Sequence, residues 1–310
     1  MASRPEGRGD ELNDYGKREK TMRLNLVTVT SALLALGMAA SAQAQEVDAI
    51  VKKLRDTKTI TMGIRETLYP YGYLDNDKKP AGYAVEFCQR IIEEIKAELK
   101  LPEIQIKYVP VNIQNRQALV ANGTVDLECG GTVNTFGRNK QVDFSSVSYV
   151  STSQLLVLKA SGITKYEDLN GKVVAVATGG SSEPDLKKLV ADKKLNIRVQ
   201  NVDDHAAALI SVETRRADAY FSDNGAFYSL IRQSKNPDAL TIVGEEYGYA
   251  PQGFMVPKLN PTILWIVNHA MGKMFKSGEA EVLFDKWFGP FGVKVGPRLR
   301  AAWATQSYAE

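Results

Sequence analysis

The stretch that decides the fold runs over residues 112–145, NIQNRQALVANGTVDLECGGTVNTFGRNKQVDFS. Its pattern predicts a short helix at 115–121, an Asn-Gly stop, a buried strand at 125–129 and a polar, glycine-bearing loop. Arg116 and Arg138 therefore stand beside the ends of regular elements and not along a solvated helix face. The stretch indicates an α/β protein with charged groups at the ends of its elements.

Strand-like and helix-like apolar patterns alternate along the rest of the chain. Apolar residues alternate at 60–64 as in a strand, and they recur at three- and four-residue spacing over 84–99 as in a helix. Further strands are predicted at 104–109, 155–158, 172–177, 197–202, 217–221, 240–243 and 254–256, and further helices at 182–192, 205–215, 225–234, within 261–276 and at 279–287 as the last element. This alternation predicts an α/β fold with largely parallel sheets.

Polar residues follow several of the predicted strands. In open α/β sheets, ligands bind in the crevice beyond the carboxyl ends of the strands. The residues that stand at such ends are Arg65, Arg138, Gly179, Gly180, Ser181, Ser182, His205 and Asp223. Because they come from two separate halves of the sequence, they predict a cleft between two lobes.

The N-terminal segment has the pattern of a secretory signal peptide. Basic residues up to Arg23 precede an apolar run over 24–40, and an Ala-Gln-Ala site ends at Ala44. The run is short for a membrane span of about 20 residues, although an uncleaved anchor is the alternative. Residues 1–21 are polar and of mixed charge, so we expect translation to begin at Met22. The remaining chain suits one large domain or two of ordinary size.

Composition narrows the class of function. Hydrophobic residues make up 44% and charged residues 24% of the chain, as in an ordinary folded protein. A formal net charge of +3, evenly mixed, is too small to indicate nucleic-acid binding. No metal-ligand spacing, phosphate-binding loop or Ser-His-Asp arrangement is apparent, so neither a cofactor nor a metal is predicted.

The sequence contains two cysteines, Cys88 and Cys129. In an exported protein an even count indicates a disulfide, here between a predicted helix and the end of a predicted strand. Closing a loop of about 40 residues would contribute roughly 4 kcal/mol in the chain-entropy model. Two buried free thiols are the alternative. The absence of a CxxC spacing or a nearby histidine argues against a redox or metal role.

Six short motifs together resemble the periplasmic glutamate/aspartate-type solute-binding proteins of the polar amino-acid ABC transporter family. The motifs are GIRE at 63–66, GY at 82–83, QNR at 114–116, NGTVDLECG at 122–130, DFS at 143–145 and DKWFG at 285–289. The resemblance implies a two-lobed periplasmic-binding-protein-like fold with two hinge crossover strands. It places lobe 1 at residues 46–150 plus 250–310 and lobe 2 at 151–249, after an N-terminal extension and signal peptide at 1–44.

The same resemblance assigns roles to single residues. It implies that Arg138 grips the ligand α-carboxylate through a bidentate fork, a geometry that suits a guanidinium. Asp223 would accept from the ligand ammonium group, Arg65 and Arg116 would contact the side-chain carboxylate, and His205 would add a donor. The alternatives are a surface salt bridge for Arg138, a helix N-cap for Asp223, structural pairing for the other arginines and an undetermined role for His205.

The remaining implied contacts are Tyr71, Gly131, Gly180, Ser181 and Ser182. The glycine–serine stretch offers backbone N–H groups at a predicted helix start, where the helix dipole favours an anion, although a capped turn without a ligand is the alternative. Among three nearby tyrosines, Tyr71 is expected to form the aromatic wall against the ligand.

Four positions depart from the family pattern, which has hydroxyl-bearing residues there. This chain has Ile113, Gly131, Val133 and Gly180 instead. Each lost hydrogen bond to the ligand would remove about 0.5–1.5 kcal/mol. An anionic ligand is still expected because the arginines are retained, but a larger or modified acidic ligand, or another carboxylate, is an open alternative to glutamate.

We therefore predict that the protein captures a small acidic amino acid or related carboxylate in the periplasm and delivers it to ABC permease subunits. We expect it to be a monomer and not an enzyme. A dehydratase-like enzyme on the same fold is the alternative; Glu66, Glu128, Glu183 and His205 would be its nearest acid–base residues. A soluble ligand sensor is a third possibility.

Overall fold

The computed structural model describes residues 48–308. The signal peptide, the start at Met22 and the cleavage site at Ala44 lie outside the described residues. Within the described part, no helix is both long and apolar enough to cross a membrane.

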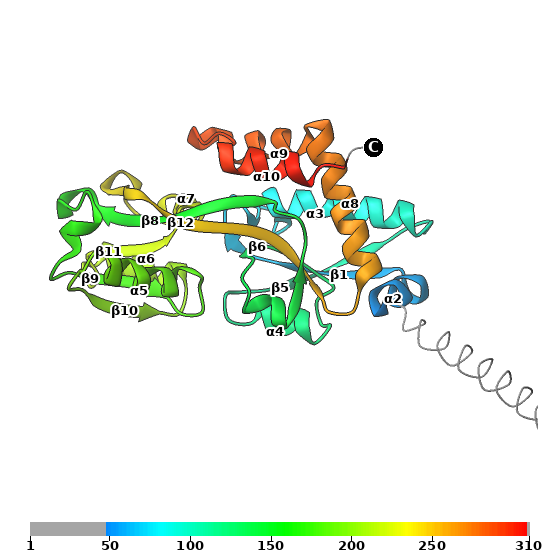
Figure 1. Ribbon diagram of the computed structural model, residues 1–310, viewed down its shortest axis with the longest axis horizontal. Helices are drawn as coiled ribbons and strands as arrows, with labels where there is room; N and C mark the ends of the chain where they lie inside the picture. Colours follow the sequence, from blue (N-terminus) through cyan, green and yellow to red (C-terminus); the bar gives the residue numbers. More distant parts are fainter. Residues whose placement is uncertain (1–47, 309–310) are drawn as a thin grey trace, which may run out of the picture. The chain divides into compact units, whose positions relative to one another are not determined.

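A nine-stranded sheet runs through the described part of the chain (Figure 1). Its strand order is β10-β9-β11-β8-β12-β6-β1-β5, and β7 pairs with β12 beside this path. The strands are β1 (Thr59–Ile64), β5 (Gln105–Pro110), β6 (Leu127–Val133), β7 (Val142–Phe144), β8 (Tyr149–Leu158), β9 (Val173–Ala177), β10 (Arg198–Val202), β11 (Ala219–Asp223) and β12 (Leu240–Pro257). A separate three-stranded sheet holds β2 (Thr67–Leu68), β3 (Gly72–Leu74) and β4 (Pro80–Ala81).

Parallel pairing is confined to the two ends of the large sheet. Strands β5, β1 and β6 pair in parallel at one end, and β10, β9 and β11 do so at the other. Between them β8 and β12 pair antiparallel to each other and to their neighbours. The two parallel groups are the sheets of the two predicted lobes, and β8 and β12 are the two crossover strands. The lobe boundaries at residues 150 and 249 stay predictions.

Helices cover the β5–β1–β6 group, which we call the first lobe. They are α2 (Ala49–Thr57), α3 (Tyr83–Glu98), α4 (Arg116–Ala121), α8 (Pro261–Ser277), α9 (Glu279–Phe288) and α10 (Pro297–Gln306). All except α4 share one large apolar core with β1 and β6, whereas α4 packs on a smaller cluster around Val125, Phe144 and Met255. The sheet of this lobe is thus buried on both faces, as parallel sheets usually are.

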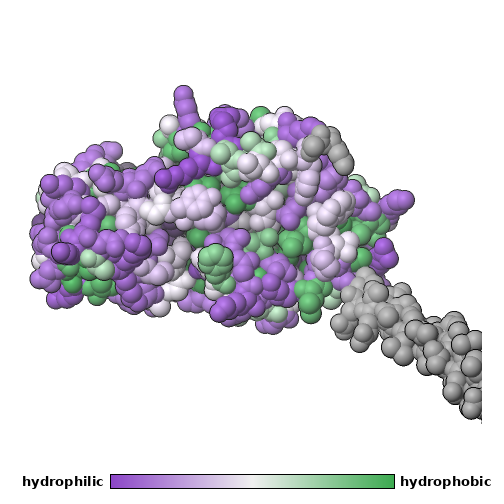
Figure 2. Space-filling view, in the orientation of Figure 1, coloured by the Kyte–Doolittle hydropathy of each residue, from purple (hydrophilic) through white to green (hydrophobic). Residues whose placement is uncertain are grey.

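The β10–β9–β11 group, the second lobe, is covered by α5 (Ser182–Asp192), α6 (His205–Glu213) and α7 (Asn224–Gln233). Two apolar clusters flank its sheet: one involves α6 and α7 with Tyr220, and the other involves α5 with Phe221. Since Tyr220 and Phe221 are neighbours on β11, their side chains point to opposite faces and each anchors one layer. Hydrophilic residues cover most of the face of this lobe seen in Figure 2.

Several sequence predictions need correction. The strands predicted at 240–243 and 254–256 are the two ends of one strand, β12, and β8 begins well before residue 155. The missed segments, residues 244–253 of β12 and 149–154 of β8, are rich in Gly and polar residues, so they lack apolar alternation. Their backbone groups are satisfied by pairing with each other across register shifts, which local sequence does not report. Helices α2 and α10 were not predicted, and α10 follows the helix that was expected to be last.

A disulfide joins Cys88 on α3 to Cys129 on β6, with Cα atoms 6.3 Å apart. The sequence prediction of this bridge is confirmed, and the free-thiol alternative is wrong. Both residues are fully buried, so the bridge fastens helix to sheet inside the core of the first lobe.

Candidate functional site

A small cavity of about 30 Å³, which we call the inner cavity, lies between the two lobes. It brings together nine of the ten residues predicted to bind the ligand: Arg65, Tyr71, Arg116, Gly131, Gly180, Ser181, Ser182, His205 and Asp223. Leu68, Ile113, Val133, Ala177, Ser222 and Gln252 complete its lining. The tenth predicted residue, Arg138, is not part of the lining.

The ends of parallel strands and the starts of helices place these side chains. Arg65 follows the last residue of β1, and His205 is the first residue of α6 after β10. Asp223 ends β11 and occupies the N-cap position of α7. Residues at the carboxyl ends of β1, β6, β9 and β11 line the cavity, so side chains far apart in sequence meet there.

Two arginines are buried in the cavity wall without a partner. Arg65 and Arg116 are 5% and 6% exposed, and neither side chain makes a hydrogen bond or ion pair with another residue in 48–308. Burial, together with the charge of Arg116, lowers the pKa of Arg65 to about 10. Burial also lowers the pKa of Arg116. A buried cation without a partner is costly, so this site favours an added anion.

Two carboxyl groups, buried Glu128 and half-buried Asp223, partly balance the charge of the arginines. Glu128 is fully buried on β6, and its Oε2 accepts a hydrogen bond of 2.9 Å from Thr132 Oγ1. Burial raises the pKa of Glu128, while Arg116, Thr132, Arg65 and Arg138 act in the opposite direction. Burial likewise raises the pKa of Asp223, against the Ala226 backbone N–H and the arginines. The site therefore combines three guanidinium groups with two carboxyl groups, which leaves an excess of positive charge.

His205 belongs to the cavity and not to a helix cap. Its Nδ1 lies 2.6 Å from the Tyr220 hydroxyl, whereas the cap of α6 is Asp204, whose Oδ1 accepts from Ala207 N at 2.8 Å. Burial, and then the charges of Arg65 and Arg116, lower the pKa of His205 to about 3. The imidazole is therefore neutral at physiological pH and offers directional hydrogen bonding without adding charge.

Arg138 connects the lobes at the edge of the site. It begins the short 3-10 helix Arg138–Lys140, and its guanidinium donates to the carbonyl of Val133 at 2.8 Å and to that of Gly179 at 3.1 Å. Burial lowers its pKa to about 10. The surface salt bridge that was the alternative for Arg138 is not formed with any residue in 48–308. Its contact with a ligand carboxylate stays a prediction.

Sequence reasoning missed Gln252 and gave Glu128 only an acid–base role. Gln252 lies in the polar middle of β12, is 2% exposed and donates from Nε2 to Ser151 Oγ at 3.0 Å, while its Oε1 has no partner among the described residues. The hydroxyl of Tyr71 is likewise buried without a partner there. A buried glutamine on an unrecognised strand gives no local sequence signal.

Gly131 leaves the space that these groups occupy. Its φ of 68° lies in the left-handed region, and a Cβ there would lie 3.0 Å from Gln252 Oε1 and 3.2 Å from the Tyr71 ring. The family pattern has a hydroxyl-bearing residue at this position. The glycine of this chain instead leaves space for the Gln252 amide and the Tyr71 ring.

The family model described as bacterial extracellular solute-binding proteins, family 3, matches residues 60–290. The chain belongs to this family. An L-glutamate/L-aspartate-binding protein of Pseudomonas aeruginosa is 35% identical to it, with 86% of this chain and 89% of that protein covered. A glutamate/aspartate import solute-binding protein of Escherichia coli is also 35% identical, with 83% and 87% covered.

Solved structures agree with the two-lobed fold of this solute-binding protein. Two structures of an ancestral arginine-binding protein, one bound to glutamine and one to arginine, each superpose on this chain with a TM-score of 0.65 at 28% identity. The superposition covers 75% of this chain, and 98% and 99% of the two compared chains. The named relatives are binding proteins, so the dehydratase-like enzyme that was the alternative is not favoured.

Proposed function

We propose that this solute-binding protein captures an acidic amino acid or a related small carboxylate in the inner cavity, in the periplasm, and passes it as a monomer to the permease of an ABC transporter. The relatives named for glutamate and aspartate support this class of ligand. The exported location rests on the signal-peptide pattern of the N-terminal segment.

The observation that carries the proposal is the pair of buried, unpartnered guanidinium groups of Arg65 and Arg116. A carboxylate placed between them would form charge-assisted hydrogen bonds, about twice as strong as neutral ones. A ligand with a neutral side chain would leave both cations unpaired. We therefore assign Arg65 and Arg116 to the side-chain carboxylate of the ligand.

Other groups around the cavity suit the amino-acid head group. Asp223 supplies a half-buried carboxylate for an ammonium group, and the start of α5 at Ser182 offers backbone N–H groups for a carboxylate. The Arg138 guanidinium donates to two backbone carbonyls. A ligand carboxylate would be a stronger acceptor than either carbonyl, so Arg138 would complete its binding.

Ligand binding in this proposal favours the closed arrangement of the lobes. The Thr67 carbonyl of the first lobe accepts from Ser229 Oγ at 2.8 Å and from Gln233 Nε2 at 3.0 Å, both on α7 of the second lobe. A ligand that touches both lobes binds the closed state more tightly and shifts the population toward it.

Calorimetric titration of the purified protein with glutamate, aspartate and glutamine tests the proposal. We expect the two dicarboxylates to bind more tightly than glutamine. Replacing Arg116→Met should weaken glutamate binding by about 2–5 kcal/mol, or roughly 30- to 5,000-fold. Arg55→Met, at an exposed arginine of α2, is the matched control. Equal binding of glutamine and glutamate, or wild-type binding by the Arg116 variant, would contradict the proposal.

A further inference from the structure

Gln252 presents a buried hydrogen-bond acceptor to the inner cavity that no residue in 48–308 satisfies. Its side chain is 2% exposed, and its Nε2 donates to Ser151 Oγ of the neighbouring strand β8 at 3.0 Å, which fixes the amide. Its Oε1 has no hydrogen-bond partner among the described residues and lies 3.0 Å from the point that a Cβ of Gly131 would occupy. Because Gly131 and Gln252 line the same cavity, this oxygen is within reach of a ligand held there.

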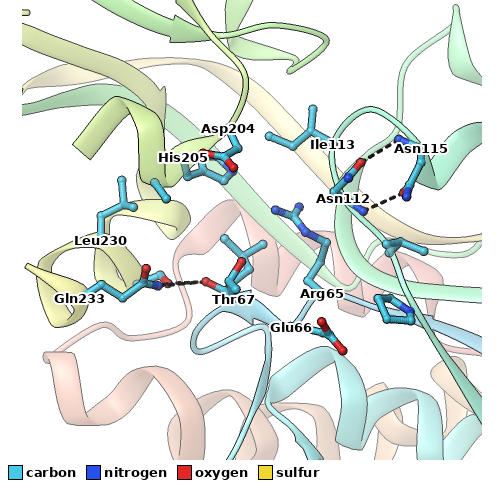
Figure 3. Close-up of a pocket in the computed structure, with 15 residues that line it drawn as sticks. Arg65, Glu66, Thr67, Asn112, Ile113, Asn115, Asp204, His205, Leu230 and Gln233 are labelled. Carbon is cyan, nitrogen blue, oxygen red and sulfur yellow. Dashed lines mark hydrogen bonds between the residues drawn. The ribbon is translucent and has the colours of Figure 1, made fainter. Parts of the chain in front are cut away.

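The charge of the site favours this orientation of the Gln252 amide. The guanidinium groups of Arg65, Arg116 and Arg138 outnumber the nearby carboxyl groups, as described above. Figure 3 shows the Arg65 side chain extending from the end of β1 toward the start of α6, into the space between the lobes. Since oxygen is the negative end of an amide dipole, the amide is more stable with Oε1 toward this excess of positive charge than with its NH₂ group there.

The ammonium group of an acidic amino acid is the group of that ligand that can satisfy Oε1. At neutral pH the two carboxylates of such a ligand only accept hydrogen bonds, whereas the ammonium group has three N–H donors. A free acceptor in the cavity wall therefore pairs with the ammonium group. Asp223 offers a second acceptor in the same wall, so Gln252 and Asp223 together engage two of the three donors.

Tyr71 relates the positions of these two acceptors. The edge of its ring lies 3.2 Å from the Cβ position of Gly131, on the side of Gln252. Its hydroxyl lies 2.5 Å from the Cβ position of Gly225, two residues after Asp223 at the start of α7. Gln252 and Asp223 thus stand beside the edge and the hydroxyl of one tyrosine, in a cavity of about 30 Å³. One small ligand group can contact both.

We propose that Gln252 is a specificity-determining residue whose Oε1 accepts a hydrogen bond from the ligand ammonium group, so that the site selects acidic amino acids over dicarboxylates without an amine. This inference rests on the proposed function and narrows its ligand class. Gly131 leaves the space for the amide, and Gln252 brings the acceptor from another strand.

The charge balance of the site supports the same selection. With Glu128 and Asp223 ionised, the three guanidinium groups leave one positive charge. An acidic amino acid has a net charge of about −1 at neutral pH and neutralises it, whereas a dicarboxylate without an ammonium group has about −2. Such a ligand would leave a negative charge buried without a counterion, and it would leave Gln252 Oε1 without a donor.

Calorimetric affinities for glutamate and glutarate test the inference, because glutarate has the same two carboxylates and no ammonium group. Gln252→Met keeps the length of the side chain and removes the acceptor. We expect it to weaken glutamate binding by about tenfold or more, as for a lost hydrogen bond to a charged group, and to leave glutarate binding within about threefold. Gln154→Met, at a half-buried glutamine of β8 outside the cavity lining, is the matched control and should leave both affinities within about threefold.

A second variant, Gln252→Glu, tests the direction of the hydrogen bond with glutamate as the only ligand. It keeps an oxygen acceptor and removes the NH₂ donor, so we expect it to bind glutamate at least about threefold more tightly than Gln252→Met does. This comparison decides if glutarate binds the wild type too weakly to measure.

Three results would overturn the inference while glutamate binding by the wild type upheld the proposed function. They are equal weakening of glutamate by Gln252→Met and Gln252→Glu, equal losses of glutamate and glutarate in Gln252→Met, and wild-type binding of glutarate as tight as that of glutamate. Failure of the wild type to bind either glutamate or aspartate would overturn both the inference and the proposed function.

Discussion

At the residue scale, the site depends on charges that are buried before any ligand arrives. Arg65, Arg116, Glu128 and Asp223 all face the same region, and burial is the largest influence on the pKa of each. Groups of this kind titrate differently in the folded and unfolded chain, so the stability of the protein depends on pH.

His205 gives a pH dependence of known sign. Its pKa falls from 6.5 to about 3 on folding, so the unfolded chain binds the extra proton between these values. The contribution of neutral His205 to the free energy of unfolding is therefore fully present above about pH 6.5. It decreases as the pH falls toward 3, by up to about 1.4 kcal/mol per pH unit. We expect His205→Gln to lose less stability than wild type between about pH 7 and pH 5 in urea unfolding. Parallel curves for the two proteins would contradict this.

Gly131 should tolerate no Cβ. Gly131→Ala would combine a φ of 68° with contacts of 3.0 Å to Gln252 and 3.2 Å to Tyr71. Gly123→Ala is the matched control, since its φ is 76° but no atom lies within 4 Å of its Cβ position. We expect the control to cost about 1 kcal/mol of unfolding free energy and Gly131→Ala to cost about 1–3 kcal/mol more. Equal losses of unfolding free energy in denaturant titrations would show that Gln252 and Tyr71 move aside at little cost, which would contradict this prediction.

At the scale of elements, two long strands decide how the site is assembled. Strand β12, of 18 residues, pairs with β8 from Leu240 to Gln252 and with β6 and β7 from Gln252 to Pro257, and it carries Gln252 into the cavity. His205 reaches the cavity as the first residue of α6, and Asp223 as the last residue of β11 and the N-cap of α7. The first lobe in turn depends on the disulfide between α3 and β6.

Removing that disulfide should destabilise the protein without changing its ligand. The bridge closes a loop with a sequence separation of 41, and neither cysteine lines the inner cavity. We expect the Cys88→Ala/Cys129→Ala variant to lose about 2–4 kcal/mol of unfolding free energy. Its calorimetric affinity for the ligand at room temperature should stay within about twofold. An unchanged unfolding midpoint would contradict the structural role.

At the scale of the whole described molecule, function depends on contacts between the lobes. Besides the ligand-facing residues, the Thr67 carbonyl with Ser229 and Gln233, and Arg138 with Gly179, hold the lobes together. Such contacts raise the population of the closed state, and the apparent affinity for a ligand rises with that population.

Loosening the contact at Thr67 should speed ligand release. Ser229→Ala removes a 2.8 Å hydrogen bond between the lobes, whereas Ser211→Ala removes a 3.0 Å bond of the same kind inside α6. We expect Ser229→Ala to weaken affinity by about 0.5–1.5 kcal/mol, mainly through a faster dissociation rate in stopped-flow measurements. The same dissociation rate in both variants would mean that the interlobe bond has no role in closure.

The sequence by itself determined the α/β class, the disulfide and nine residues of the cavity wall. Apolar periodicity reports burial, and residues at the carboxyl ends of parallel strands converge in a sheet of this kind, which accounts for the fold class and six of the nine residues. Tyr71, Arg116 and Gly131 came from the family resemblance, and the disulfide from the even cysteine count of an exported chain. The start of α5 at Ser182 was predicted to the residue, since glycines and serines mark it locally.

Only the tertiary structure decided the rest. The continuous strand β12, the burial of Gln252, the balance of Glu128 against three arginines and the placement of Arg138 on two carbonyls all depend on contacts between segments far apart in sequence. A cavity of about 250 Å³ is of the same kind, because Thr67 and Asn112 of the first lobe and Asp204 of the second line it together. Local patterns record which residues prefer burial, but packing decides which buried groups meet and which are left for a ligand.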